Sequence, residues 1–253
     1  MFLFFLLYIL QTNAVHIDKC KYISYTETQH KIEIVKKLPH EKFCYTQGLY
    51  INDTVLYESC GMYNQSAISM YEWPSLKLMK SRSVPDKQFA EGIAIVNETL
   101  VMLTWKENIM HLINPKSMQF NYEVKYPFKG WGAANDDHDN LYVTDGTNKI
   151  RQIRILHNSE IEVIKEWGLR RGKHPVSKLN EIEIIGNLMY INIYWEDKIF
   201  VVNMDNMSVV GEIWCNVKRE GNEEVMNGIA RIDDSTLLIT GKYWDSMFEL
   251  KIK

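Results

Sequence analysis

The stretch that decides the fold reads Glu91-Gly92-Ile93-Ala94-Ile95, then Val96-Asn97-Glu98-Thr99, then Leu100-Val101-Met102-Leu103. An apolar run that follows a glycine is typical of a buried strand, and Asn97 and Glu98 are polar residues suited to a turn. The apolar run resumes directly after this turn. The stretch therefore predicts two neighbouring strands joined by a tight turn.

The same pattern occurs five times in the chain. Its copies begin near Gln47, Glu91, Trp131, Asn180 and Asn227. A period of about 40 to 50 residues with strand-turn-strand content is typical of the blades of a β-propeller. Helical repeats of that length would space their apolar residues by 3.6, and these stretches alternate by two. The sequence therefore predicts an all-β, five-bladed β-propeller.

Each of the first four copies is followed by a third and a fourth strand, but the fifth copy ends after its third strand, Phe248-Glu249-Leu250-Lys251-Ile252. The stretch Ile32-Glu33-Ile34-Val35 precedes the first copy, where every other fourth strand precedes the next copy. We expect this N-terminal strand to close the last blade, which removes the open edges of the ring. Residues 30–253 are then a single catalytic domain.

Residues 1–10 are almost wholly apolar, a run too short to span a bilayer comfortably. Residues 1–14 are predicted to be a signal peptide, and an uncleaved signal anchor stays open because a positive first region is missing. Four glycosylation sequons begin at Asn52, Asn64, Asn97 and Asn206. We therefore expect a glycoprotein of the secretory pathway, in the ER lumen or secreted, that meets a membrane only if the segment is uncleaved.

The composition and net charge limit the classes of partner that the protein is expected to bind. A net charge of −3 and a pI of about 6.2 argue against nucleic acid as a partner, because phosphate binding needs a basic surface. Four cysteines permit two disulfides in an oxidising compartment, with three possible pairings.

Several strand ends carry residues that a purely structural strand does not need. At the starts of the predicted innermost strands these are Tyr45, Gln47, Phe89, Glu91, Trp131 and Asn180, and at the ends of the second strands they are Trp105, Trp195 and Lys242. Equivalent positions of a ring converge, so the set predicts one pocket. Blade packing or bound water is the alternative for each residue alone, but a structural role would tend to repeat one residue type.

Metal and cofactor motifs are weak. The cysteines form no C-x-x-C pair and the histidines no metal-binding pair on one element. The acidic run from Asn135 to Asn140 lies between two predicted strands and is read first as a turn. No metal and no cofactor is predicted.

The sequence resembles the plant and bacterial type of glutaminyl cyclase from about residue 30 to its end. The phrases that carry the resemblance are Tyr45-Thr46-Gln47-Gly48-Leu49, Tyr57-Glu58-Ser59, Phe89-Ala90-Glu91-Gly92, Leu103-Thr104-Trp105, Gly130-Trp131-Gly132, Thr144-Asp145-Gly146, Leu179-Asn180-Glu181, Asn227-Gly228-Ile229-Ala230 and Thr240-Gly241-Lys242. The resemblance implies a five-bladed propeller, metal-independent cyclisation, and a pocket made by the residues named above. Tyr45 stands where the family usually has Phe. Cys44 and Cys60 also depart from the family pattern, and the hairpin between them makes a local disulfide conceivable.

The activity so implied is the closure of an N-terminal glutamine into pyroglutamate with release of ammonia, on peptides or proteins. Glu91 is expected to act as general base and then general acid, with a pKa raised by the tryptophan wall. Gln47, Asn180 or Lys242 is expected to stabilise the oxyanion. Two alternatives stay open. One is a non-catalytic propeller that binds a peptide terminus or a glycan, and the other is a calcium-dependent propeller hydrolase.

Overall fold

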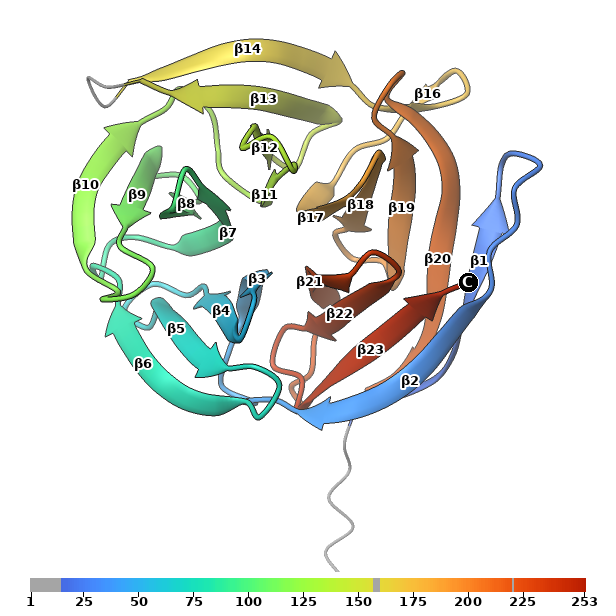
Figure 1. Ribbon diagram of the computed structural model, residues 1–253, viewed down its shortest axis with the longest axis horizontal. Coiled ribbons are helices and arrows are strands. Elements are labelled where there is room, and N and C mark those ends of the chain that lie inside the picture. The colour runs from blue at the N-terminus through green and yellow to red at the C-terminus, as the bar shows by residue number, and fades with distance from the viewer. Residues whose placement is uncertain (1–14, 157–159, 220) are drawn as a thin grey trace, which may run out of the picture.

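The computed structural model describes residues 15–156, 160–219 and 221–253. The predicted signal peptide, residues 1–14, lies outside the described residues. Five β-sheets surround a central axis in a propeller-like arrangement (Figure 1). The innermost strands contact one another in ring order, which runs from β3 (Thr46–Asn52) to β7 (Ala90–Val96), β11 (Ala133–Asn135), β17 (Leu179–Ile185) and β21 (Met226–Asp233) and back to β3. The predicted all-β class is confirmed for the residues described, and none of their helices is long and apolar enough to cross a membrane.

Four of the sheets have four strands each. The first contains β3 (Thr46–Asn52), β4 (Val55–Cys60), β5 (Ala67–Glu72) and β6 (Lys77–Ser83). The second contains β7 (Ala90–Val96), β8 (Thr99–Thr104), β9 (Ile109–Ile113) and β10 (Phe120–Lys125). The third contains β11 (Ala133–Asn135), β12 (Leu141–Thr144), β13 (Lys149–Ile155) and β14 (Ile161–Gly168). The last contains β21 (Met226–Asp233), β22 (Thr236–Gly241), β23 (Ser246–Ile252) and β2 (Ile32–Pro39).

The remaining sheet departs from this plan because it has seven strands. Its four central strands are β17 (Leu179–Ile185), β18 (Leu188–Ile193), β19 (Lys198–Asn203) and β20 (Ser208–Lys218). Its additional strands are β1 (His16–Ser24), β15 (Arg170–Arg171) and β16 (His174–Pro175). The arrangement therefore consists of four regular blades and one larger sheet.

The decisive hairpin forms as its sequence predicts. The turn residues Asn97 and Glu98 both have positive φ, 46° and 60°, the backbone of a two-residue turn that matches the twist of the flanking strands. Every residue of β7 is buried, so burial does not alternate along this strand, and Glu91 is its one charged residue. By contrast, β6 at the outside of its blade is almost wholly exposed, which accounts for its lysines and arginine.

The last blade is closed by the N-terminal strand, as predicted. β2 pairs antiparallel with β23, from Ile32 opposite Ile252 to Pro39 opposite Ser246. Ile32 and Leu38 of β2 are buried in the core. Two segments from opposite ends of the described chain therefore share one sheet.

The strand β1 has no counterpart in the repeat pattern. It pairs antiparallel with β20, and a disulfide joins Cys20 of β1 to Cys215 of β20. A second disulfide joins Cys44 to Cys60 at the entrance of the first blade, the local pairing that the hairpin made conceivable. All four cysteines are thus paired.

Candidate functional site

A cavity of about 170 Å³ lies where the ends of the inner strands meet. It is lined by Tyr45, Gln47, Met62, Phe89, Glu91, Trp105, Trp131, Asn180, Tyr194 and Lys242. Eight of the nine residues predicted for the pocket are in this set. The exception is Trp195.

Equivalent places on different sheets explain this convergence. Gln47, Glu91 and Asn180 are each the second residue of an innermost strand, in β3, β7 and β17. Trp105 and Lys242 are each the first residue after a second strand, β8 and β22. A ring brings such matched positions to one point on its axis, so chemically different side chains share one cavity.

Trp195 was expected in the cavity, and the structure corrects this. Its side chain is 60% exposed in the turn after β18. The first residue after β18 is Tyr194, which occupies the position of Trp105 and Lys242 and lines the cavity. Trp195 follows in the turn with a φ of +71°, and its side chain is directed toward solvent. Counting from the strand end, rather than searching for tryptophan, would have selected Tyr194.

Asn227 is a second residue that the sequence prediction missed. It is the second residue of β21, and so matches Gln47, Glu91 and Asn180, and it is fully buried. Its Nδ2 donates to the Thr46 carbonyl at 2.9 Å and to Gln47 Oε1 at 3.1 Å. Asn227 thus orients the Gln47 amide toward the cavity. Met62 was missed as well, and nothing in its sequence context marks it.

Lys242 is the single buried cation of the cavity among the described residues. Its Nζ donates to Gln47 Oε1 at 2.6 Å and lies 4.2 Å from the centre of the Tyr45 ring. Burial lowers the pKa of Lys242 to about 8, and the carboxylates of Glu91 and Glu224 oppose this shift. The ammonium is therefore held by an amide oxygen and an aromatic face, and no carboxylate of the described residues lies within ion-pair distance.

Glu91 is the carboxyl group of the cavity. It is 3% exposed, and the described residues offer its carboxyl group no hydrogen bond. Burial raises the pKa of Glu91 well above that of an ordinary glutamate, Lys242 lowers it in part, and the nearby Glu107 raises it further. A carboxyl group that is buried and unpaired, and that takes up a proton readily, is suited to carry protons in a reaction.

Glu181, the residue after Asn180 in β17, has a different role. Its Oε1 accepts the Leu49 N–H at 3.3 Å and its Oε2 accepts the Ile229 N–H at 2.8 Å. These two bonds join β17 to β3 and to β21 across the centre of the ring. Both carboxylate oxygens are occupied by backbone, so Glu181 ties sheets together and is not available to a substrate.

Aromatic rings form one wall of the cavity. The Phe89 ring makes edge contacts with the rings of Tyr45, Tyr63 and Trp105 at centre distances of 5.5 to 6.1 Å. Gly61 leaves room for this cluster, because a Cβ there would lie 2.2 Å from the Phe89 ring. The cluster excludes water from the Glu91 side of the cavity and so contributes to its raised pKa.

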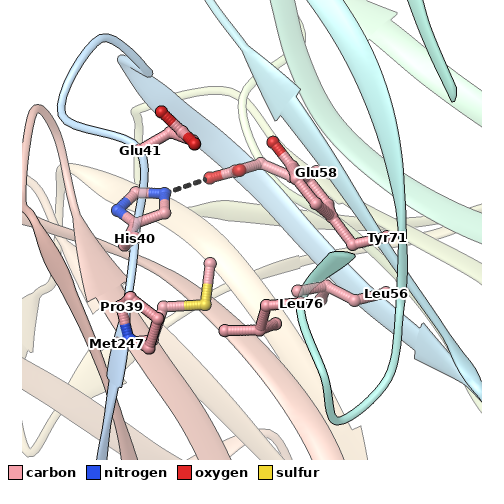
Figure 2. A pocket seen from close by; sticks show the side chains of 8 residues that line it. All are labelled: Pro39, His40, Glu41, Leu56, Glu58, Tyr71, Leu76 and Met247. Atoms are coloured by element: carbon pink, nitrogen blue, oxygen red, sulfur yellow. Dashed lines mark hydrogen bonds and ion pairs between the residues drawn. The ribbon is translucent and has the colours of Figure 1, made fainter. Parts of the chain in front are cut away.

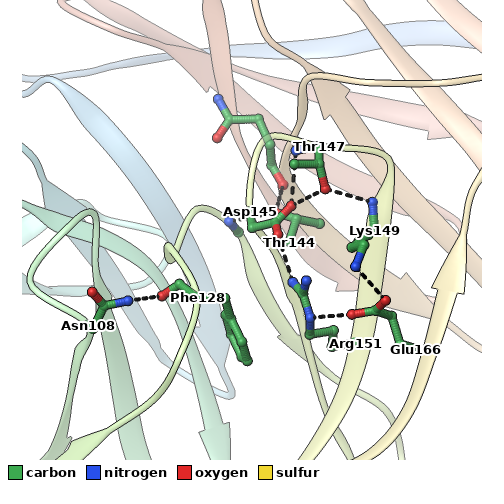
Figure 3. A network of polar contacts seen from close by, with 10 residues as sticks. Asn108, Phe128, Thr144, Asp145, Thr147, Lys149, Arg151 and Glu166 are labelled. Atoms are coloured by element: carbon green, nitrogen blue, oxygen red, sulfur yellow. Dashed lines mark hydrogen bonds and ion pairs between the residues drawn. The ribbon is translucent and has the colours of Figure 1, made fainter.

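A polar network surrounds the turn after β12 in the third blade (Figure 3). Arg151 bridges Asp145 at 2.8 Å and Glu166 at 2.7 Å, and so fixes the turn that follows β12. Gly146 in this turn has a φ of +80°, and a Cβ at this position would lie 2.6 Å from the Trp131 ring. The turn therefore provides a flat support on which Trp131 lies.

Each neighbouring pair of sheets is joined by a hydrogen bond near the cavity, with donor–acceptor distances of 2.6 to 3.2 Å. These bonds run from Ser59 Oγ to the Glu91 carbonyl, from the Gly92 N–H to the Trp131 carbonyl, from Thr144 Oγ1 to the Asn180 carbonyl, from the Gly228 N–H to Asn192 Oδ1, and from Asn227 Nδ2 to the Thr46 carbonyl. Three of the acceptors are the backbone carbonyls of cavity residues. The ring closure and the geometry of the site are thus fixed by the same bonds.

A second cavity, of about 100 Å³, contains a buried histidine–glutamate pair (Figure 2). His40 Nε2 lies 2.7 Å from Glu58 Oε1, and Thr46 Oγ1 donates to the same oxygen at 2.9 Å. Burial alone would lower the pKa of His40, but the Glu58 carboxylate outweighs it and the pKa is raised. The pair holds Thr46, and with it the start of β3 that carries Gln47.

The group His40, Cys44 and Glu58 is close enough to hold a metal ion. Its chemistry does not fit one, because Cys44 Sγ is bonded to Cys60 and supplies no thiolate, and His40 Nε2 is already bonded to Glu58.

Comparison with known proteins decides the family. The family model for glutamine cyclotransferase matches residues 5–252. The chain belongs to the glutamine cyclotransferase family. It is 27% identical over 234 residues to a glutaminyl-peptide cyclotransferase of Arabidopsis thaliana, which covers 88% of this chain and 72% of that protein. The crystal structure of Myxococcus xanthus glutaminyl cyclase has a TM-score of 0.75 at 23% identity, over 88% of this chain and 96% of that one. The WD40 repeats of RRP9 follow at a TM-score of 0.54 and 9% identity, over 88% and 97% of the two chains.

Proposed function

We propose that this member of the glutamine cyclotransferase family converts the N-terminal glutamine of peptides and proteins to pyroglutamate, with Glu91 as the proton carrier. The observation that carries the role of Glu91 is its carboxyl group, which faces a cavity without a partner and has a strongly raised pKa. The family supports the activity on peptide or protein substrates.

The reaction needs little beyond positioning and proton transfer. The α-nitrogen of the substrate glutamine forms a bond to the Cδ of its own side chain, and the bond from Cδ to the amide nitrogen breaks. Ionised Glu91 accepts a proton from the attacking nitrogen and returns it to the departing nitrogen, which leaves as ammonia. Both reacting groups belong to one residue, so a cavity that keeps the side chain curled supplies the proximity.

The oxyanion that forms during attack is stabilised by the polar side of the cavity. Lys242 retains N–H groups beyond the one given to Gln47 and carries a charge below a pH of about 8. The amides of Gln47 and Asn180 are further donors on the cavity wall. The aromatic wall excludes water, which strengthens each of these interactions.

The blade count, domain organisation and cellular compartment that we propose for this activity are those expected from the sequence. Strands β17 to β20 act as the fifth blade of a five-bladed propeller, to which β1, β15 and β16 are additions. Residues 30–253 form one catalytic domain that needs no metal, and two disulfides and four sequons suit a glycoprotein of the secretory pathway.

The test is turnover of a glutamine-initiated peptide, followed by ammonia release, with and without a strong chelator. We expect activity that the chelator does not affect. Glu91→Gln keeps the shape but cannot carry a proton, so the rate is expected to fall by at least about 10². Glu98→Gln, an exposed residue of the same hairpin, is the matched control and stays at the wild-type rate.

The outcomes separate the parts of this proposal. A wild-type protein that turns over no glutamine-initiated peptide contradicts the activity and favours a binding propeller. Loss of activity with the chelator favours a calcium-dependent enzyme. A folded Glu91→Gln variant with a near-normal rate contradicts the role of Glu91 alone.

A further inference from the structure

A further hollow lies next to the cavity that contains Glu91, on the side of Tyr194 that faces Trp195. It has a volume of about 510 Å³ and is lined by Lys19, Lys21, Trp195, Glu196, Asp197, Trp214, Cys215, Asn216 and Val217. Its two tryptophans are unusually open to solvent, Trp195 at 60% and Trp214 at 36%. Two exposed tryptophans around one hollow are typical of a binding surface, because tryptophan is otherwise mostly buried.

The backbone of Trp195 supports this interpretation. Trp195 has a φ of +71°, a conformation that is unfavourable for a large side chain. This conformation turns the ring outward, where little of its area is buried. Packing of the ring therefore does not account for the unfavourable backbone conformation. Strain of this kind is found preferentially at functional sites.

Two adjacent residues, Tyr194 and Trp195, place the hollow next to the cavity. Tyr194 lines the cavity, and its ring contacts the Trp131 ring on one side and the Trp195 ring on the other, at centre distances of 5.4 and 4.9 Å. An extended peptide advances about 3.3 Å per residue. A chain whose first residue occupies the cavity therefore reaches Trp195 within three or so residues.

The charged side chains of the hollow that lack a partner among the described residues are both positive. Glu196 is paired with Lys198 at 2.5 Å, and Asp197 is paired with Arg219. Lys19 and Lys21 are exposed, and no described acidic side chain lies within ion-pair distance of either. The uncompensated charge of the hollow is positive, so it attracts an acidic ligand.

The wall that carries these lysines is firmly held. β1 pairs with β20 so that Lys21 lies opposite Trp214, and the disulfide fixes Cys20 to Cys215 next to this pair. Since β1 is an addition outside the four-stranded unit, the hollow exists only because this strand is present.

We propose that the hollow is a subsite for the substrate chain beyond its N-terminal glutamine. It selects peptides that carry an aromatic and an acidic side chain at about the third to fifth positions. The inference rests on the proposed cyclase activity and adds a sequence preference to it. Trp195 and Trp214 contact the aromatic side chain, and Lys19 and Lys21 attract the acidic one.

The experiment compares three glutamine-initiated substrates: a dipeptide amide too short to reach the hollow, a hexapeptide with Phe and Glu at positions 3 to 5, and the same hexapeptide with Lys for Glu. Trp195→Ala is expected to lower kcat/KM for the acidic hexapeptide about tenfold, through KM, and to leave the dipeptide unchanged. Phe43→Ala, which removes an aromatic side chain that is 90% exposed before β3, is the matched control and changes neither.

The double variant Lys19→Glu, Lys21→Glu provides independent evidence, because it alters only exposed charges. It is expected to reverse the preference, so that the basic hexapeptide becomes the better substrate. Equal kcat/KM values for all peptides in wild type and variants overturn the subsite while leaving the cyclase activity intact. Absence of turnover with every substrate, the dipeptide included, refutes the activity itself.

Discussion

Burial acts in opposite directions on the carboxyl group and the ammonium group of the cavity. It raises the pKa of Glu91 and lowers that of Lys242, because in each case the charged form loses its hydration. The cavity thus shifts both groups toward their neutral forms. The α-ammonium of the substrate brings a positive charge beside Glu91 and favours the carboxylate that the reaction needs.

The lowered pKa of Lys242 predicts an alkaline limit to activity. The folded pKa of about 8 lies below the ordinary value of 10.5, so Lys242 loses its charge as the pH rises through about 8. If the ammonium stabilises the oxyanion, kcat/KM falls over this range. Lys242→Met is expected to have a lower kcat/KM without this limb. The measurement is the pH dependence of kcat/KM, which reports groups of the free enzyme; an unchanged limb in the variant would assign it to another group.

A substitution of Trp131 distinguishes a role in substrate recognition from a role in core packing. Trp131→Phe retains most of the apolar area, so the free energy of unfolding is expected to fall by only about 1 kcal/mol. Turnover is expected to fall much more, by about tenfold, because the curled glutamine side chain is misplaced.

The matched control for Trp131 is Trp167→Phe, a tryptophan that packs against the core away from the cavity. Its activity per folded molecule should remain normal. Thermal unfolding and turnover of a short glutamine peptide measure the two effects. The assignment fails if both variants lose stability and activity to the same degree.

The residues of the site could largely be predicted from the sequence because they occupy matched positions of a repeat. The error at Trp195 arose from giving residue type priority over position. Its neighbour Tyr194 stands at the matched place, and the turn directs Trp195 outward. Asn227 stands at the matched position of the fifth repeat, so counting positions would have selected it as well; its bond to Gln47 on another sheet is what the sequence does not reveal.

At the scale of elements, local and distant pairing differ in how well they can be predicted. The β7–β8 hairpin could be predicted because its turn and both strands are contiguous in sequence. The pairing of β2 with β23 could be inferred only because the repeat lacked a strand. β1 repeats no part of the blade pattern, and its place beside β20 is set by the Cys20–Cys215 bond and by tertiary contacts.

The closure by β2 predicts a strong effect of its removal. Deleting residues 30–36 removes Ile32 from the core and leaves β23 with an open edge. We expect a loss of at least about 4 kcal/mol and a melting temperature lower by about 10 °C. Val35→Ala, an exposed position in the same strand, is the control and should be neutral. An unchanged melting temperature in the deletion variant would show that β2 does not close the ring.

At the scale of the whole molecule, the site belongs to no single blade. Cavity residues come from all five sheets, and the hydrogen bonds that join neighbouring sheets end on or beside them. Sequence repeats indicated the ring, but they could not show that one sheet carries three additional strands, because those strands do not repeat.

The sharing of one blade between β2 and β23 has a consequence for how the protein is made. A ribosome adds about 5 to 20 residues per second, so β23 emerges roughly 10 to 40 s after β2. During that interval the nascent chain is an open arc with unpaired strand edges, and Cys20 cannot form its disulfide until Cys215 has been synthesised. The arc must be kept from pairing with other chains until β23 is available. The emergence of β23, rather than the folding of any one blade, therefore sets the moment at which this enzyme first acquires its cavity.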